Sequence, residues 1–201
     1  EISSRELLHF ENAIKASQSS EASAKSLDKV IAQAKRELYK CTTAVHNRLQ
    51  SIAKNTFNHH PELFDKEQRS TIDYFHSTLI FSAFKKFEFG YVFLSFGVGD
   101  CPMVIFNEAN DEAHLLNYLD VGEFGGGTRF ITQPGIFHST ERPMSGRFNL
   151  KIVDDFSYFF MMTDGIYDAK FIVEANLEKV EKWKEFLIDL RGGNEDGIGL
   201  E

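Results

Sequence analysis

Residues 159–165 hold the side chains best suited to chemistry, because a run of four large apolar residues leads through Thr163 to Asp164 and Gly165. The run is too short for a capped helix, so it predicts a strand, covered on both faces, that ends on a carboxylate. A carboxylate left unpaired at a core rim is costly, so we expect a partner or a cation beside Asp164. Gly165 would give the backbone a positive φ and admit a carbonyl or a metal-bound water. The alternative to a metal site is an Asp-Gly turn that only ends a strand.

A second segment has the same order of residue types. The apolar run 91–96 leads to Gly99 and Asp100, and a further apolar run follows at 103–106. Two strands that each end on an acid favour one shared acidic site.

Four motifs follow one another along the chain. They are His-Ser-Thr-Leu at 76–79, Val-Gly-Asp-Cys at 98–101, Gly-Glu-Phe-Gly-Gly-Gly-Thr-Arg-Phe at 122–130 and Met-Thr-Asp-Gly-Ile-Tyr-Asp at 162–168. In this order and spacing they resemble the motifs of the metal-dependent protein phosphatase 2C (PPM) family, in its bacterial branch. The resemblance covers residues 70–190.

The resemblance implies an α+β fold, an α-β-β-α sandwich of two antiparallel sheets flanked by helices. It implies two or three divalent cations, Mg²⁺ or Mn²⁺, in the cleft between the sheets. The implied activity is hydrolysis of phosphoserine and phosphothreonine in a phosphorylated protein by a metal-activated water, without a covalent intermediate. Such hard cations take oxygen ligands, which agrees with carboxylates at the strand ends.

Carried onto the matching positions, the resemblance makes Asp164 a ligand of the first metal and Asp100 an acid that helps to hold a third. Asp196 would be the last ligand, although Gly-Ile-Gly follows it instead of the family's closing Asp-Asp/Asn-x-Thr pattern. The family's Asp-Gly-x-Gly motif has no counterpart before Leu27. Two interpretations follow. We favour a portion of a larger phosphatase that lacks its end segments, because missing strands would expose sheet edges; the alternative is a catalytically inactive homologue that acts as a binding or regulatory module.

The segment Asp120–Gly146 is rich in Gly and Pro and predicts a flap over a surface. Arg129 and Arg142 could meet a substrate phosphate there, and the alternative is that both are solvated loop arginines. The glycines at 125–127 are not a P-loop, because no Gly-Lys-Ser/Thr follows. Three other phosphatase or hydrolase chemistries are excluded: neither cysteine is followed by an Arg six residues later, and the sequence has no Asp-x-Asp pair and no Gly-x-Ser-x-Gly elbow.

The composition predicts a single domain over residues 1–201, since 42% hydrophobic residues are enough for a sizeable core. The net charge of −8 argues against a nucleic-acid partner. No apolar run reaches the roughly 18 residues of a membrane span. The two cysteines lack metal-binding spacing, so we expect reduced thiols and a cytoplasmic protein. A monomer is expected.

Helices are predicted at Ser3–Ala16, along one long apolar seam, and at Glu174–Leu190. The segments Asn149–Asp154 and Tyr158–Thr163 predict a hairpin that delivers Asp164. Further strands are predicted at Phe75–Phe84, Phe89–Gly97, Pro102–Phe106 and His114–Leu119. The seam consists of Leu27, Ile31, Ala34, Leu38, Cys41, Val45, Leu49 and Ile52.

Overall fold

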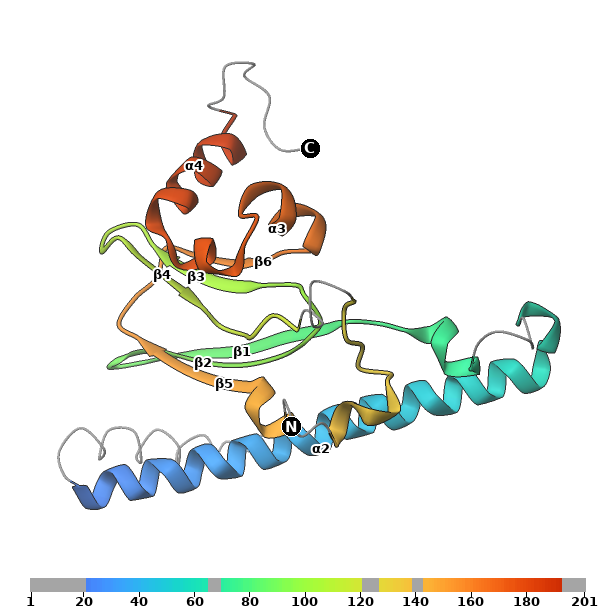
Figure 1. Ribbon diagram of the computed structural model, residues 1–201. Coiled ribbons are helices and arrows are strands. Elements are labelled where there is room, and N and C mark those ends of the chain that lie inside the picture. Colours follow the sequence, from blue (N-terminus) through green and yellow to red (C-terminus); the bar gives the residue numbers. More distant parts are fainter. Residues whose placement is uncertain (1–20, 65–69, 121–126, 139–142, 193–201) are drawn as a thin grey trace.

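The computed structural model describes residues 21–64, 70–120, 127–138 and 143–192. They form two antiparallel three-stranded sheets between helices, which confirms the predicted α+β sandwich (Figure 1). The helix predicted at Ser3–Ala16 lies outside the described residues. The helices are α2 (Glu21–His59), α3 (Asp164–Lys170) and α4 (Val180–Leu190), and the strands are β1 (Leu79–Phe87), β2 (Gly90–Val98), β3 (Met103–Asn107), β4 (Glu112–Leu115), β5 (Phe148–Val153) and β6 (Tyr158–Met161). Short 3-10 helices are η1 (Pro61–Leu63), η2 (Thr71–Phe75), η4 (Pro134–Phe137), η5 (Met144–Arg147) and η6 (Glu174–Glu178).

One sheet has the strand order β1-β2-β5 and the other the order β4-β3-β6. A hairpin forms the first part of each sheet: Phe87 of β1 lies opposite Gly90 of β2, and Asn107 of β3 lies opposite Glu112 of β4. The C-terminal half then adds one strand to each sheet, β5 beside β2 and β6 beside β3. The chain therefore crosses between the sheets after β2, after β4 and after β5.

The predicted hairpin of β5 with β6 is wrong, because these strands lie in different sheets. The link between them carries Phe156, whose ring centroid lies 4.8 Å from that of Tyr91 and 5.1 Å from that of Phe93. Phe156 packs in the apolar cluster between the two sheets. Burial of this ring draws the link across the layers, and β2 gains β5 as a second hydrogen-bonded neighbour.

Helix α2 confirms the predicted long helix and crosses the outer face of the β1-β2-β5 sheet (Figure 1). Its buried face is turned slightly from the predicted seam. Thr42 and Ala53 are 1% and 2% exposed, whereas the seam residues Val45 and Ile52 are 41% and 38% exposed and Cys41 is exposed too. The most buried positions of α2 thus carry small side chains, and α2 packs mainly against the 3-10 helices η1, η2 and η5. Of the seam residues, Leu38 and Leu49 pack against the cluster beneath the helix. The cluster under α2 consists of Leu38, Leu49, Leu79, Phe81, Phe96, Val98, Ile131, Ile136, Phe137 and Phe148.

Strand β1 begins at Leu79, later than predicted. Residues 71–75 form η2 instead, because the Ser70 side chain and the Asp73 side chain each cap the other's backbone N–H. The Ser70 N–H donates to Asp73 Oδ2 at 2.9 Å. A capping box of this kind favours a helical turn over a strand at the same residues.

The helix predicted at Glu174–Leu190 is interrupted at Lys179, where the backbone is extended. Before the break lies η6 and after it α4. The Trp183 indole N–H donates to the Leu177 carbonyl at 2.7 Å, so a side chain of α4 accounts for a carbonyl that a continuous helix would have used.

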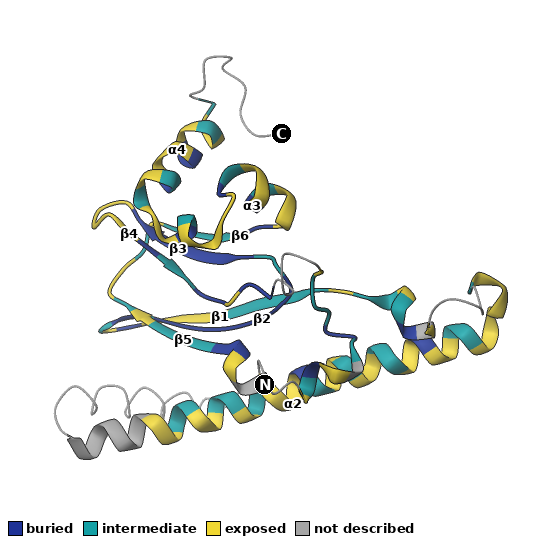
Figure 2. Ribbon diagram, viewed as in Figure 1, coloured by how far each residue is buried: buried dark blue, intermediate teal, exposed yellow. Residues whose placement is uncertain are grey.

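The central strands β2 and β3 are buried along nearly their whole length (Figure 2). Strand β6 is an edge strand. Both of its faces are covered as predicted, since Phe159 packs between the sheets and Phe160 beneath α4. Its residues are nevertheless only half-buried, and Met161 is 48% exposed. Among the described helices, none is long and apolar enough to cross a membrane.

Candidate metal centre

Asp100 lies on the segment that carries the chain from β2 in one sheet to β3 in the other. Gly99 before it has φ +112°, a conformation that side chains rarely adopt. A Cβ on Gly99 would also lie 2.7 Å from Cβ of Thr78. Glycine is therefore required on two grounds, and the turn that it allows sets Asp100 at one end of the sandwich. Because Thr78 belongs to the motif at 76–79, the close approach also explains why this motif accompanies Gly-Asp.

Asp164 is the first residue of α3, directly after β6. Thr163 is the N-cap with an extended backbone, and Oδ1 of Asp164 accepts a hydrogen bond of 2.8 Å from the Gly165 N–H. The prediction of a positive φ at Gly165 is wrong, because this residue is part of α3. A Cβ on Gly165 would meet no atom closer than Thr163 Oγ1 at 3.9 Å. The sequence Asp-Gly here starts a helix and does not make a turn.

Contacts around Cys101 show that the two acids share one corner of the fold. The Met162 N–H donates to the Pro102 carbonyl at 3.1 Å, which ties the end of β6 to the segment after Asp100. Burial raises the pKa of the Cys101 thiol, and the negative charges of Asp100 and Asp164 raise it further. Asp100 and Asp164 each lie two residues beyond the bond between Pro102 and Met162 on adjacent antiparallel segments, so both flank the half-buried Cys101.

The loop after β4 is fastened to this corner through Asp120. This residue is 1% exposed, and its N–H donates to the Gly99 carbonyl at 2.8 Å. Its carboxylate pairs with the guanidinium of Arg147, which is also buried, and Oδ1 lies 3.7 Å from Nε of Arg129. Removing either buried partner would strand a charge in the core. A phosphate contact by Arg129 stays a prediction, since its guanidinium lies beside a carboxylate.

The same loop brings Thr128 to Asp100. The Thr128 hydroxyl donates a hydrogen bond to Oδ2 of Asp100. The next residue, Arg129, donates its backbone N–H to the Asp120 carbonyl at 3.4 Å. The backbone next to Thr128 is therefore attached to Asp120, which the buried ion pair with Arg147 holds in place.

The oxygen atoms at this corner suit a hard divalent cation. The described hydrogen bonds are accepted by Oδ2 of Asp100 and Oδ1 of Asp164. The second oxygen of each carboxylate could therefore serve as a metal ligand. Mg²⁺ keeps several waters and is often bound through one or two carboxylates. Within the described ranges, no three His, Cys, Asp or Glu side chains are grouped to hold a metal. Asp196, the last predicted ligand, and Arg142 both lie outside the described residues.

The comparison with protein families agrees with the motifs. A family model for protein phosphatase 2C matches residues 10–195. The chain belongs to the protein phosphatase 2C family. The matched range includes the four motifs as well as both acids of the corner. Searches among curated proteins and among solved structures gave no match.

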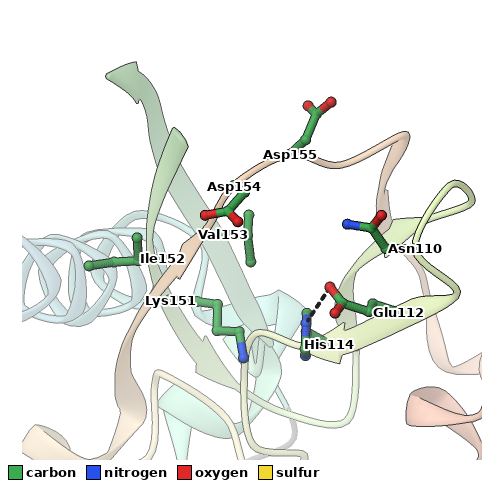
Figure 3. Close-up of a pocket in the computed structure, with 8 residues that line it drawn as sticks. All are labelled: Asn110, Glu112, His114, Lys151, Ile152, Val153, Asp154 and Asp155. Carbon is green, nitrogen blue, oxygen red and sulfur yellow. Dashed lines mark ion pairs between the residues drawn. The ribbon is translucent and has the colours of Figure 1, made fainter. Parts of the chain in front are cut away.

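At the other end of this phosphatase 2C sandwich lies a pocket of about 210 Å³ (Figure 3). It adjoins Val153, which pairs with Tyr91 at the start of β2, whereas Asp100 follows the end of β2. The nine residues of β2 place these ends about 30 Å apart. No predicted site residue lines the pocket, whose walls are Asn110, Glu112, His114, Lys151, Ile152, Val153, Asp154 and Asp155.

Three residues near the phosphatase 2C corner were not predicted: Thr128, Asp120 and Arg147. For Asp120 a signal existed, because the mainly apolar residues 115–119 lead to an acid, the same order that identified Asp100 and Asp164. Thr128 lies in the motif at 122–130 and Arg147 in no motif, and neither follows an apolar run. Their partners, Asp100 and Asp120, lie 28 and 27 residues earlier in the chain, and local sequence does not show such contacts.

Proposed function

We propose that this chain is a metal-dependent phosphatase that hydrolyses phosphoserine and phosphothreonine esters in a phosphorylated protein. The observation that supports the proposal is the bond from the Met162 N–H to the Pro102 carbonyl, which holds the segments of Asp100 and Asp164 together beside Cys101, in a chain of the phosphatase 2C family. The two acids come from segments more than sixty positions apart in the numbering, and the fold brings them to one corner.

Asp164 and Asp100 would hold Mg²⁺ or Mn²⁺ through carboxylate oxygens. When bound, such a cation acts as a Lewis acid: it would activate water for attack on phosphorus and offset negative charge on the phosphoryl oxygens. Asp164 contributes an oxygen whose direction is set by the bond of its Oδ1 to the Gly165 N–H. Arg129, at the rim of the same loop, is the residue we propose for contact with the substrate phosphate.

A second candidate function is a phosphatase-like binding or regulatory module without turnover. It is favoured by the number of acids, because the described residues bring two carboxylates to the corner and no group of three. Such a module would bind its partner without any dependence on Mn²⁺. We also propose a cytoplasmic monomer, which the free thiols of Cys41 and Cys101 support.

The test is Mn²⁺-dependent hydrolysis of para-nitrophenyl phosphate and of a phosphothreonine peptide by the full-length protein that carries this sequence. We expect Asp164→Asn to lower the rate by at least about 100-fold, since changes to residues that only support metal ligands already cost 10–100-fold. The matched control is Asp28→Asn, which removes an exposed carboxylate of α2. It should retain the full rate.

Full activity of the Asp164→Asn variant would show that Asp164 is not a ligand of the proposed metal site. A folded wild-type protein without activity at any Mn²⁺ or Mg²⁺ concentration would overturn the enzyme proposal and favour the binding module. Circular dichroism of each variant distinguishes a lost site from a lost fold.

A further inference from the structure

The loop between β4 and β5 brings Thr128 of the motif at 122–130 to the corner that holds Asp100 and Asp164, and the sequence assigns this residue no role. We propose that Thr128 is a positioning residue: its hydroxyl fixes Oδ2 of Asp100 and leaves Oδ1 for a divalent cation. The inference rests on the proposed metal-dependent function and adds a determinant of cation affinity to it.

Two backbone contacts hold the residues that directly follow Thr128. The Arg129 N–H donates to the carbonyl of the buried Asp120. The Ile131 N–H donates to the Ser77 carbonyl at 2.9 Å, next to Thr78, whose side chain closely approaches Gly99. A side chain on a backbone that is held in this way loses less freedom when it donates a hydrogen bond.

Helix α2 supports the same stretch of loop from the opposite side. His46 Nδ1 lies 2.7 Å from the Ile131 carbonyl, and Gln50 Nε2 donates to the Thr132 carbonyl at 3.0 Å. The backbone that follows Thr128 is thus supported from the segment before β1, from α2 and through the ion pair of Asp120 with Arg147. These supports act on the backbone, whereas only the hydroxyl of Thr128 acts on Asp100.

The hydroxyl matters because a carboxylate can rotate about its last bond. A donor on one oxygen removes that freedom and fixes where the second oxygen lies. Hydrogen bonds that orient metal ligands in this way typically account for 10–100-fold in metal affinity. We therefore expect loss of the hydroxyl to weaken the binding of Mn²⁺, and we expect a smaller effect on the rate at saturating Mn²⁺.

The experiment compares three variants of the full-length protein. Thr128→Val removes the hydroxyl with little change of shape, and Thr128→Ser restores it. The matched control is Thr132→Val, because Thr132 lies in the same loop, is fully buried and bonds through its hydroxyl to Nδ1 of His76 at 3.1 Å. It tests whether loosening the loop is enough. Mn²⁺ affinity is measured by calorimetry, and the Mn²⁺ concentration for half-maximal hydrolysis is measured in parallel.

The inference predicts about tenfold weaker Mn²⁺ binding in Thr128→Val, near wild-type binding in Thr128→Ser and an unchanged Mn²⁺ affinity in Thr132→Val. If wild type binds Mn²⁺ and Thr128→Val binds it equally well, the positioning role is overturned while the metal-dependent function stands. Equal weakening in Thr128→Val and Thr132→Val would also overturn it, because both would then act through the loop. If the folded wild type binds no Mn²⁺, the inference and the proposed function both fail.

Discussion

Two glycines beside the two acids have opposite roles, although each forms a Gly-Asp or Asp-Gly pair in the sequence. Gly99 adopts a positive φ against Thr78, whereas Gly165 is an ordinary residue of the first turn of α3. The letters alone do not separate these cases. The difference comes from what approaches each backbone, and that depends on the tertiary fold.

Gly99→Ala and Gly165→Ala should therefore change stability in opposite directions. We expect Gly99→Ala to lower the free energy of unfolding by about 2–4 kcal/mol, because it combines backbone strain with a steric clash. Gly165→Ala should raise that free energy by up to about 1 kcal/mol, since its Cβ finds open space in a helix. Urea denaturation followed by the fluorescence of the one tryptophan, Trp183, measures both. Destabilisation by Gly165→Ala would show that its helical conformation is wrongly assigned.

Residues of the site were predictable where a strand delivers them. Asp100 and Asp164 each follow an apolar run, so their position after a strand could be inferred, whereas their role as metal ligands stays a prediction. Thr128 was not predictable, because its function comes from a hydrogen bond across 28 residues of chain. Arg147 was missed for the same reason, because the sequence does not distinguish a buried arginine from an exposed one unless its ion-pair partner is known.

At the scale of elements, α2 shows how far periodicity can be trusted. Spacing of three and four residues predicted the helix and its general apolar side correctly. It did not predict which part of that side is most deeply buried, because the apolar stripe is wider than the buried contact. Small residues, Thr42 and Ala53, lie at the contact, and a hydrophobicity pattern gives such residues little weight.

A pair of neighbouring substitutions tests the orientation of α2. Ala53→Asp should lower the free energy of unfolding by about 3–5 kcal/mol, because it places a charge without a partner beneath the helix. Ile52→Asp should cost about 1 kcal/mol or less, since Ile52 lies at the exposed flank. Thermal unfolding followed by circular dichroism checks both. A larger loss for Ile52→Asp would mean that the seam predicted from spacing is the buried one.

The strands β5 and β6 show the limit of local spacing. Only a short link separates them, which is typical of a hairpin. Each nevertheless pairs with a strand from earlier in the chain, and the two pairs lie in different sheets. Short links indicate that two strands are near each other, but they do not indicate which edges are open. That information lies in β2 and β3, more than forty positions earlier in the numbering.

For the whole molecule, the two sheets share one aromatic cluster, so they should unfold together. Phe93 of β2 is fully buried there, and its ring centroid lies 5.8 Å from that of Phe159 of β6. Trp183 reports on the layer of α3 and α4, whereas the ellipticity at 222 nm is dominated by the long α2 on the other side. The layer of α3 and α4 has its own buried cluster around Trp183, but the shared aromatic cluster joins the two sheets, so we expect a single unfolding transition.

We expect the denaturation curves from Trp183 fluorescence and from far-ultraviolet circular dichroism to coincide. Phe93→Ala should shift both curves together, with a loss of about 3–5 kcal/mol, because it opens a cavity that both sheets line. If the fluorescence curve stayed in place while the ellipticity curve moved, the two layers would be separate folding units.

The segment that holds Asp100 connects the two sheets, whereas Asp164 follows a strand of only one. Sliding of one layer over the other would therefore change the separation of the two carboxylates. A cation bound by both carboxylates would oppose such sliding. If the cation binds as proposed, its affinity and the packing of the two sheets are linked. Changes that loosen the packing of one sheet on the other should then weaken binding of the cation.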